Sequence, residues 1–152
     1  MTGLPTDYRD RNNEAMSRIL QAIASAGLNS HIIVLGHIED MDLGSLMRVA
    51  AVVIQPSLFE GWSLVLQDAK ALGRPIICSD IPLHREQLPE AVGFFRPNRP
   101  DELAALLAEN WARFDCGFNR DGENCALAAE QEFARVHGLR LLDICNEALR
   151  SN

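Results

Sequence analysis

Two carboxylates near the middle of the chain, Glu60 and Asp68, have the residue type and spacing that most suggest chemistry. Glu60 lies between an apolar run and the turn Gly61-Trp62-Ser63, which opens a helical pattern. A helix N-terminus favours anions, because its N–H groups are unpaired and its dipole is positive there. A phosphate alone would be repelled by a neighbouring carboxylate. The arrangement therefore predicts a ligand of two halves, with phosphates at the turn and hydroxyl groups at Glu60.

A simpler interpretation of both carboxylates stays open at this point. Glu60 could be a solvated loop residue, and Asp68 could be a polar position on an amphipathic helix. Asp68 lies about one and a half turns into the predicted helix, so its side chain reaches the ligand only if that face is turned to the cleft. Spacing alone does not decide between the two interpretations.

The bulk composition narrows the class of protein. The chain has 152 residues, of which 47% are hydrophobic and 23% charged, as in an ordinary water-soluble single domain. A net charge of −7, with both signs mixed along the chain, disfavours a nucleic-acid-binding protein. No apolar run reaches the roughly 20 residues of a membrane span. The expected location is the cytoplasm, with at most peripheral association with the inner face of the membrane.

Cysteine and histidine spacing predicts neither a metal site nor a cofactor. The four cysteines lie far apart and form no CxxC pair, and the histidines do not interleave with them at ligand spacing. We expect scattered buried thiols in a reduced compartment. A disulfide between Cys116 and Cys125 is allowed by spacing but has no positive support. The residues concerned are Cys78, Cys116, Cys125, Cys145, His31, His37, His84 and His137.

Predicted helices and strands alternate along the chain. Helices are expected at 9–26, from an N-cap at Asp42 to 49, at 63–72, at 101–114, and in two C-terminal pieces interrupted near Gly138. Strands are expected at 32–35, 51–54, 76–78 and 92–95, with a loop at 79–87 that holds at most one helical turn. Such alternation with short connections predicts an α/β fold with a parallel sheet and right-handed crossovers.

The central segment closely resembles the signature of family 4 retaining glycosyltransferases. The resemblance is carried by PSLFEGWS (56–63), ALGRPI (71–76) and SD (79–80), and extends from GLPTDYR (3–9) to DEL (101–103). It implies the GT-B fold, in which two Rossmann-like domains face a cleft. Residues 1–152 would then be a single three-layer α/β/α domain, the C-terminal one, which binds the nucleotide-sugar donor.

The resemblance also implies roles for individual residues. Glu60 matches the first acid of the family's paired motif, which contacts donor-sugar hydroxyls near the reacting carbon. Asp68 takes the place of the second, usually a glutamate that grips the ribose. Because aspartate is one methylene shorter, that contact would be longer, water-bridged or lost. The remaining donor contacts correspond to the backbone at Gly61, Trp62, Ser63 and Leu64 and, at the nucleobase edge, at Gly36, His37 and Ile38.

Three residues further along give smaller indications. His84-Arg85-Glu86 resembles a branch of the family that acts on cell-surface or lipopolysaccharide sugars. His84 and Arg85 could face the cleft and touch phosphate, or form a surface loop pair. Glu86 matches a common family glutamate, which would orient the site or hold the loop. Trp62 could form a wall of the sugar pocket or simply pack beside the helix.

The expected function is transfer of a sugar, with retention, from a nucleotide-sugar to a glycan or lipid-linked acceptor in cell-surface polysaccharide synthesis. No metal is expected, because in the family basic residues and helix dipoles take its place. The family's basic pair for the diphosphate and its acceptor-binding N-terminal domain have no match here, so the chain is expected to be a fragment, inactive by itself. The alternative is a non-catalytic module that binds a nucleotide or phosphosugar for regulation.

Overall fold

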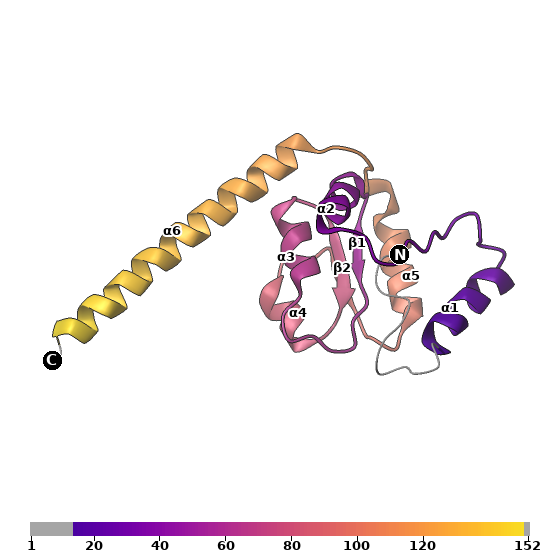
Figure 1. Ribbon diagram of the computed structural model, residues 1–152, viewed down its shortest axis with the longest axis horizontal. Helices are drawn as coiled ribbons and strands as arrows, with labels where there is room; N and C mark the ends of the chain where they lie inside the picture. Colours follow the sequence, from indigo (N-terminus) through magenta and orange to yellow (C-terminus); the bar gives the residue numbers. More distant parts are fainter. Residues whose placement is uncertain (1–13, 151–152) are drawn as a thin grey trace. The chain divides into compact units, whose positions relative to one another are not determined.

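The computed structural model describes residues 14–150 and divides them into two compact units, the first ending at Leu43 and the second starting at Gly44. The first unit contains α1 (Glu14–Ser25), and α2 (Asp40–Val49) spans the boundary (Figure 1). The second contains β1 (Val53–Gln55), α3 (Leu64–Ala71), β2 (Ile76–Ser79), α4 (Pro82–Gln87), β3 (Gly93–Phe95), α5 (Pro100–Asn110), the short 3₁₀ helix η1 (Trp111–Arg113) and α6 (Arg120–Arg150).

The three strands form one parallel sheet in the order β1-β2-β3. Val53 pairs with Ile76 across the first pair of strands, and Ile77 pairs with Gly93 across the second. Parallel neighbours need a crossover between them, and α3 and α4 provide these crossovers. The predicted α/β fold with a parallel sheet is confirmed.

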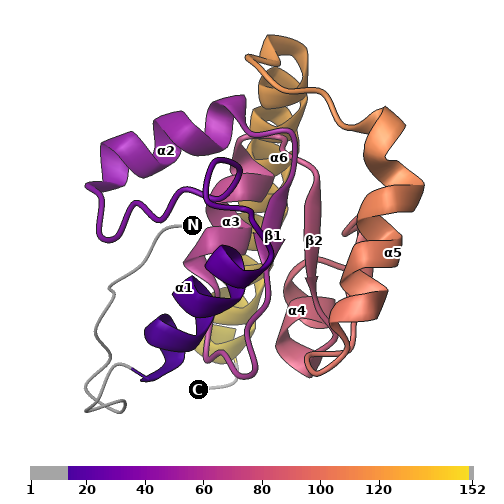
Figure 2. The same cartoon turned by 90° about the vertical axis from the view of Figure 1, so that its right-hand side faces the viewer.

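Helices cover both faces of this sheet. On one face, Ile76 and Cys78 of β2 pack with Leu66 and Ala69 of α3 in the main core cluster. Side chains alternate along a strand, so the intervening positions point to the other face. There α5 packs so tightly that a Cβ at Gly93 would lie 2.6 Å from a methyl group of Leu106. Figures 1 and 2 show α3 and α5 with the strands between them, as expected for α/β/α layers.

The segment 32–35 is not the strand that its apolar sequence predicted. It is extended coil, and the sheet of the described residues has three strands that begin at Val53. Ile33 is 67% exposed and Leu35 is 44% exposed, whereas a central parallel strand would bury both faces. An apolar run predicts burial but not a pairing partner, and here the sheet begins later.

The C-terminal region also differs from the prediction. α6 is one continuous helix of 31 residues, so the predicted interruption near Gly138 is wrong. A glycine inside a helix costs only about 1 kcal/mol relative to alanine, which a long helix absorbs.

Further differences are small: α2 begins at Asp40, two residues before the predicted N-cap, and the loop at 79–87 contains the six-residue α4. The first five residues of the helix predicted at 9–26 lie outside the described residues.

The cysteines are all free, and only Cys78 is buried. Burial raises the pKa of the Cys78 thiol to about 11. Cys116, Cys125 and Cys145 are exposed, which corrects the expectation of buried thiols, and Cys116 and Cys125 are not bonded to each other. The exposure arises because α6 and the segment before it contribute no residue to the buried core.

Candidate functional site

Glu60 follows the carboxyl end of β1, where ligands bind in open α/β sheets. Its Oε1 accepts two hydrogen bonds, from Gln55 Nε2 at 2.7 Å and from Ser57 Oγ at 2.6 Å. Gln55 Nε2 also donates to Ser57 Oγ, at 3.1 Å. Gln55 is the last residue of β1, so a regular strand anchors this small network. The Glu60 carboxylate is therefore held in one orientation rather than free in a loop.

Residues from β2 and α4 support the same loop from behind. Ser79, the last residue of β2, donates through Oγ to the carbonyl of Ser57 at 2.5 Å. The Ser79 carbonyl in turn accepts from Nδ1 of His84 at 2.8 Å. Both Ser79 and His84 are fully buried. His84 is thus enclosed and bound to the protein, so it is neither the cleft-facing residue nor the surface-loop residue that the sequence allowed.

The start of α3 is held by Gln87, the last residue of α4. Gln87 Oε1 accepts from the Ser63 N–H at 3.2 Å, and Gln87 Nε2 donates to the Ser63 carbonyl at 2.7 Å. Ser63 is the N-cap residue, but its own side chain makes no capping bond. One backbone N–H expected to receive an anion is therefore already paired, and the expected anion contact shifts to its neighbours in the turn.

The neighbours of Ser63 are open to solvent. Gly61, Trp62 and Leu64 are exposed, and a Cβ added at Gly61 would meet no atom within 4 Å apart from its chain neighbours, which leaves room for a ligand to approach the backbone there. Trp62 Nε1 donates to Gln67 Oε1 at 3.0 Å, so the indole is turned along α3. The structure places Glu60 and this turn at the same edge of the sheet, as predicted.

The other predicted residues are placed in different surroundings. Asp68 is exposed on α3, and Glu86 is exposed on α4. Arg85 is already engaged, because its guanidinium makes a bidentate ion pair with Asp80 and lies 4.4 Å over the Phe94 ring. The hydrogen bond from Arg85 holds the pKa of Asp80 below its ordinary value. Gly36, His37 and Ile38 belong to the first unit, where Gly36 has a φ of +69°, which favours glycine.

Gln55, Ser57, Ser79 and Gln87 are the residues of this site that sequence reasoning did not single out. Gln55 and Ser57 carried one usable signal, since both are polar and lie just after the predicted strand 51–54. The bond between Gln87 and Ser63 joins residues 24 positions apart, and no local pattern predicts it. Ser79 lay within the quoted motif, but its support of the loop depends on how β2 and the loop pack.

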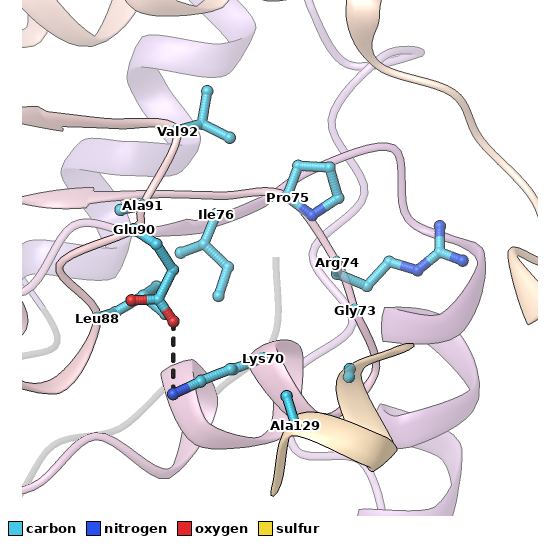
Figure 3. Close-up of a pocket in the computed structure, with 11 residues that line it drawn as sticks. Lys70, Gly73, Arg74, Pro75, Ile76, Leu88, Glu90, Ala91, Val92 and Ala129 are labelled. Atoms are coloured by element: carbon cyan, nitrogen blue, oxygen red, sulfur yellow. Dashed lines mark ion pairs between the residues drawn. The ribbon is translucent and has the colours of Figure 1, made fainter. Parts of the chain in front are cut away.

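Two hollows flank α3. One, of about 400 Å³, lies along its outer face and is lined by Trp62, Gln67, Glu86 and Phe133, among others. The second, of about 260 Å³, lies near the start of β2, where Lys70 and Glu90 face each other at 3.4 Å (Figure 3). That is the end of the sheet opposite to Glu60, and small apolar residues such as Ala91, Ala126 and Ala129 line much of it.

Arg74 belongs to the wall of the second hollow but is engaged elsewhere. In Figure 3 its guanidinium points away from Lys70 and Glu90, and Nη1 donates to the Ala50 carbonyl at 3.0 Å. The second hollow therefore offers a ligand few polar groups. No helix of the described part of the chain is long and apolar enough to cross a membrane.

Comparison with known proteins finds a family of enzymes that this chain matches. The model of the family described as "Glycosyl transferases group 1" matches residues 12–110. O-antigen chain mannosyltransferase B of Escherichia coli is 32% identical over 80 residues, 50% of this chain and 20% of that protein. Serotype-specific mannosyltransferase WbdA of Escherichia coli is 30% identical over 126 residues, 80% of this chain and 15% of that protein. This chain thus spans a fifth or less of either relative.

A solved structure shares the fold. Sucrose-phosphate synthase from Thermosynechococcus elongatus superposes with a TM-score of 0.63 and 21% sequence identity. The superposition covers 88% of this chain and 37% of that chain. The α/β fold with its parallel sheet is therefore that of part of a GT-B structure.

Proposed function

Because this chain belongs to the group 1 glycosyl transferases, we propose that it forms the donor-binding part of an enzyme that transfers a sugar from a nucleotide-sugar. Mannose is the proposed sugar and a surface polysaccharide the proposed product, since two similar proteins are mannosyltransferases and one is named for the O-antigen chain. Retention at the anomeric carbon is part of the proposal and is supported by the resemblance of residues 56–80 to retaining enzymes.

The observation that carries the proposal is that hydrogen bonds from the protein hold the Glu60 carboxylate. Two donors converge on Oε1, so the side chain is pre-oriented at the carboxyl edge of the sheet before any ligand arrives. A carboxylate accepts hydrogen bonds from sugar hydroxyls, and the exposed residues Gly61 and Trp62 would offer their backbone N–H groups to the diphosphate. Pre-orientation lowers the entropy cost of binding and of holding the reacting carbon in place.

Glu60 would act on the donor sugar in two ways. It would hold the ring by its hydroxyls, and its negative charge would stabilise positive charge that develops at the anomeric carbon. Transfer also needs an acceptor held in line with that carbon and charge stabilisation on the leaving diphosphate. We propose that residues outside this chain supply the acceptor site, a glycan or lipid-linked sugar being the acceptor.

The test is donor binding by the purified chain, measured by calorimetry with GDP, GDP-mannose and the corresponding UDP and ADP compounds. We expect one nucleotide-sugar to bind more tightly than its nucleotide diphosphate. Glu60→Gln keeps the size of the side chain but removes the charge. It should weaken the nucleotide-sugar about tenfold, since a hydrogen bond to a charged group contributes roughly 1.5–3 kcal/mol. The nucleotide diphosphate alone should bind equally to both proteins.

Each other outcome has a definite meaning. If no nucleotide-sugar binds, the chain is not a sufficient donor site and the proposal fails. If the nucleotide diphosphate binds as tightly as the nucleotide-sugar, and Glu60→Gln changes neither, the sugar-facing role of Glu60 fails. That result would favour the alternative function, a regulatory module that recognises the nucleotide.

A further inference from the structure

The hollow on the outer face of α3 is lined by both aromatic and charged side chains. Trp62 stands at the start of α3, Phe133 projects from α6, and Glu86 comes from α4. The volume of about 400 Å³ falls in the range of roughly 300–1,000 Å³ that small-ligand sites occupy. None of the residues of the Glu60 network, Gln55, Ser57 and Glu60, lines the hollow, whereas Trp62 borders both the hollow and the turn after Glu60.

Both aromatic side chains of the hollow leave more than half of their surface exposed. Trp62 is 56% exposed and Phe133 is 58% exposed. The Trp62 indole N–H already donates to Gln67, so its exposed surface is mainly ring carbon. One part of the Phe133 ring is covered by His137, at 3.9 Å between ring centroids. The remaining ring surfaces can bury the C–H face of a flat apolar group.

The polar groups of the hollow determine the charge of the ligand. Three carboxylates, Glu86, Glu90 and Glu130, against one ammonium, Lys70, leave two negative charges, which disfavours a phosphate or an acidic sugar. Lys70 is paired with Glu90 at 3.4 Å and with Glu130 at 3.6 Å. Two of the three carboxylates are thus partly neutralised, which weakens the attraction for a cation.

The hollow therefore offers hydrogen-bond donors and acceptors but attracts neither anionic nor cationic ligands strongly. Gln67 accepts from Trp62 through Oε1, and its Nε2 stays a donor. The Glu86 side chain makes no ion pair or hydrogen bond with another residue of the described chain and offers acceptor oxygens. Donors and acceptors around two aromatic faces suit a pyranose, which has hydroxyls at its rim and C–H groups on its faces.

We propose that this hollow is a subsite for a neutral oligosaccharide, distinct from the donor site at Glu60. One sugar ring would lie against Trp62 and Phe133, with its hydroxyls on Gln67 and Glu86. In the proposed enzyme this subsite would hold a growing glycan close to the place where the next sugar is added. The choice of mannose for the probe rests on the proposed function; the choice of a neutral sugar rests on the hollow itself.

The experiment titrates the purified chain with α-linked mannotetraose and follows backbone amide shifts by NMR. We expect shifts at residues of α3, α4 and α6 around the hollow. Phe133→Ala should weaken binding about tenfold, since the side chain is exposed and its loss removes one stacking face. The matched control is Phe118→Ala, which removes the same side chain, 60% exposed, outside the hollow and should leave affinity unchanged.

A second readout uses tryptophan fluorescence. In Trp111→Phe the remaining indole is Trp62, and its emission should change on addition of mannotetraose but not of choline, the cationic probe. Shifts at the hollow with choline alone, no shifts with mannotetraose, or equal loss in both phenylalanine variants would overturn the proposal. Phe133→Ala should keep the nucleotide-sugar affinity, and a failure of donor binding in the unmodified chain would refute only the proposed function.

Discussion

The packing of Gly73 against α6 gives a prediction whose size can be worked from the structure. Gly73 follows the C-cap of α3 with a φ of +61°, and a Cβ built there would overlap the carbonyl oxygen of Gly122 in α6. The neighbouring atom belongs to backbone, so no side chain can rotate out of the way. The change to test is Gly73→Ala.

Three contributions decide its magnitude. The left-handed backbone costs an alanine roughly 1–2 kcal/mol. The lower entropy of the unfolded alanine chain returns about 0.4–1 kcal/mol. Relief of the overlap requires α6 or the turn after α3 to shift, and such overpacking typically costs about 1–3 kcal/mol. We therefore expect Gly73→Ala to lower the free energy of unfolding by about 3 kcal/mol.

The assay is urea unfolding followed by far-ultraviolet circular dichroism, with Gly138→Ala as the matched control. Gly138 lies inside α6 with ordinary helical φ and nothing within 4 Å of its Cβ position, so alanine there should stabilise by about 0.5–1 kcal/mol. Gly73→Asn separates the two causes, because asparagine tolerates the left-handed backbone but still carries the Cβ. A cost below about 1 kcal/mol for Gly73→Ala would refute the reasoning.

Four further outcomes test other features. Gln87→Leu should speed amide exchange at Ser63 and destabilise by about 1–3 kcal/mol, because a backbone N–H and C=O lose their partner. Iodoacetamide at pH 8 should modify three cysteines of the folded chain and spare Cys78, whose thiol is buried with a raised pKa; rapid labelling of all four would contradict this. Asp80 has a lowered pKa in the folded state, so its ionised carboxylate stabilises the fold above the unfolded-state pKa. This stabilisation is lost as the pH falls through the folded-state pKa of Asp80. In Arg85→Leu, the free energy of unfolding should therefore decrease less between neutral and acidic pH, as measured by urea unfolding at a series of pH values. Donor affinity should be the same in Mg²⁺ and in EDTA, and a requirement for the metal would contradict the expectation that donor binding needs none.

The sheet was largely predictable from the sequence. The runs at 51–54, 76–78 and 92–95 correspond to β1, β2 and β3, because β-branched and aromatic residues between turn residues carry a strong local signal. The run at 32–35 has the same composition but is not a strand in the described chain. A strand needs a neighbour to pair with, and pairing depends on parts of the fold that composition does not encode.

The candidate site was predictable only in part, for a related reason. Glu60 and the turn after it stood out because a lone carboxylate lies there between an apolar run and the Gly61-Trp62-Ser63 turn that opens a helix. The groups that hold them, Ser79 and Gln87, form bonds across 22 and 24 positions, which are decided by packing. His84 illustrates the limit, since a polar residue on a six-residue helix can face either way, and here it is enclosed.

The support of the Glu60 loop from behind affects how such a site could be altered. The shape of this loop is maintained by partly buried hydrogen bonds from β2 and α4, while Trp62 and Leu64 are exposed to solvent. The residues that fix the conformation of the loop are therefore different from those that form its exposed surface. Leu64 could be exchanged, and with it the surface of the proposed sugar site, without disturbing the residues that hold the Glu60 carboxylate. Single substitutions at exposed positions such as Leu64 could in the same way change the preferred substrate without changing the fold.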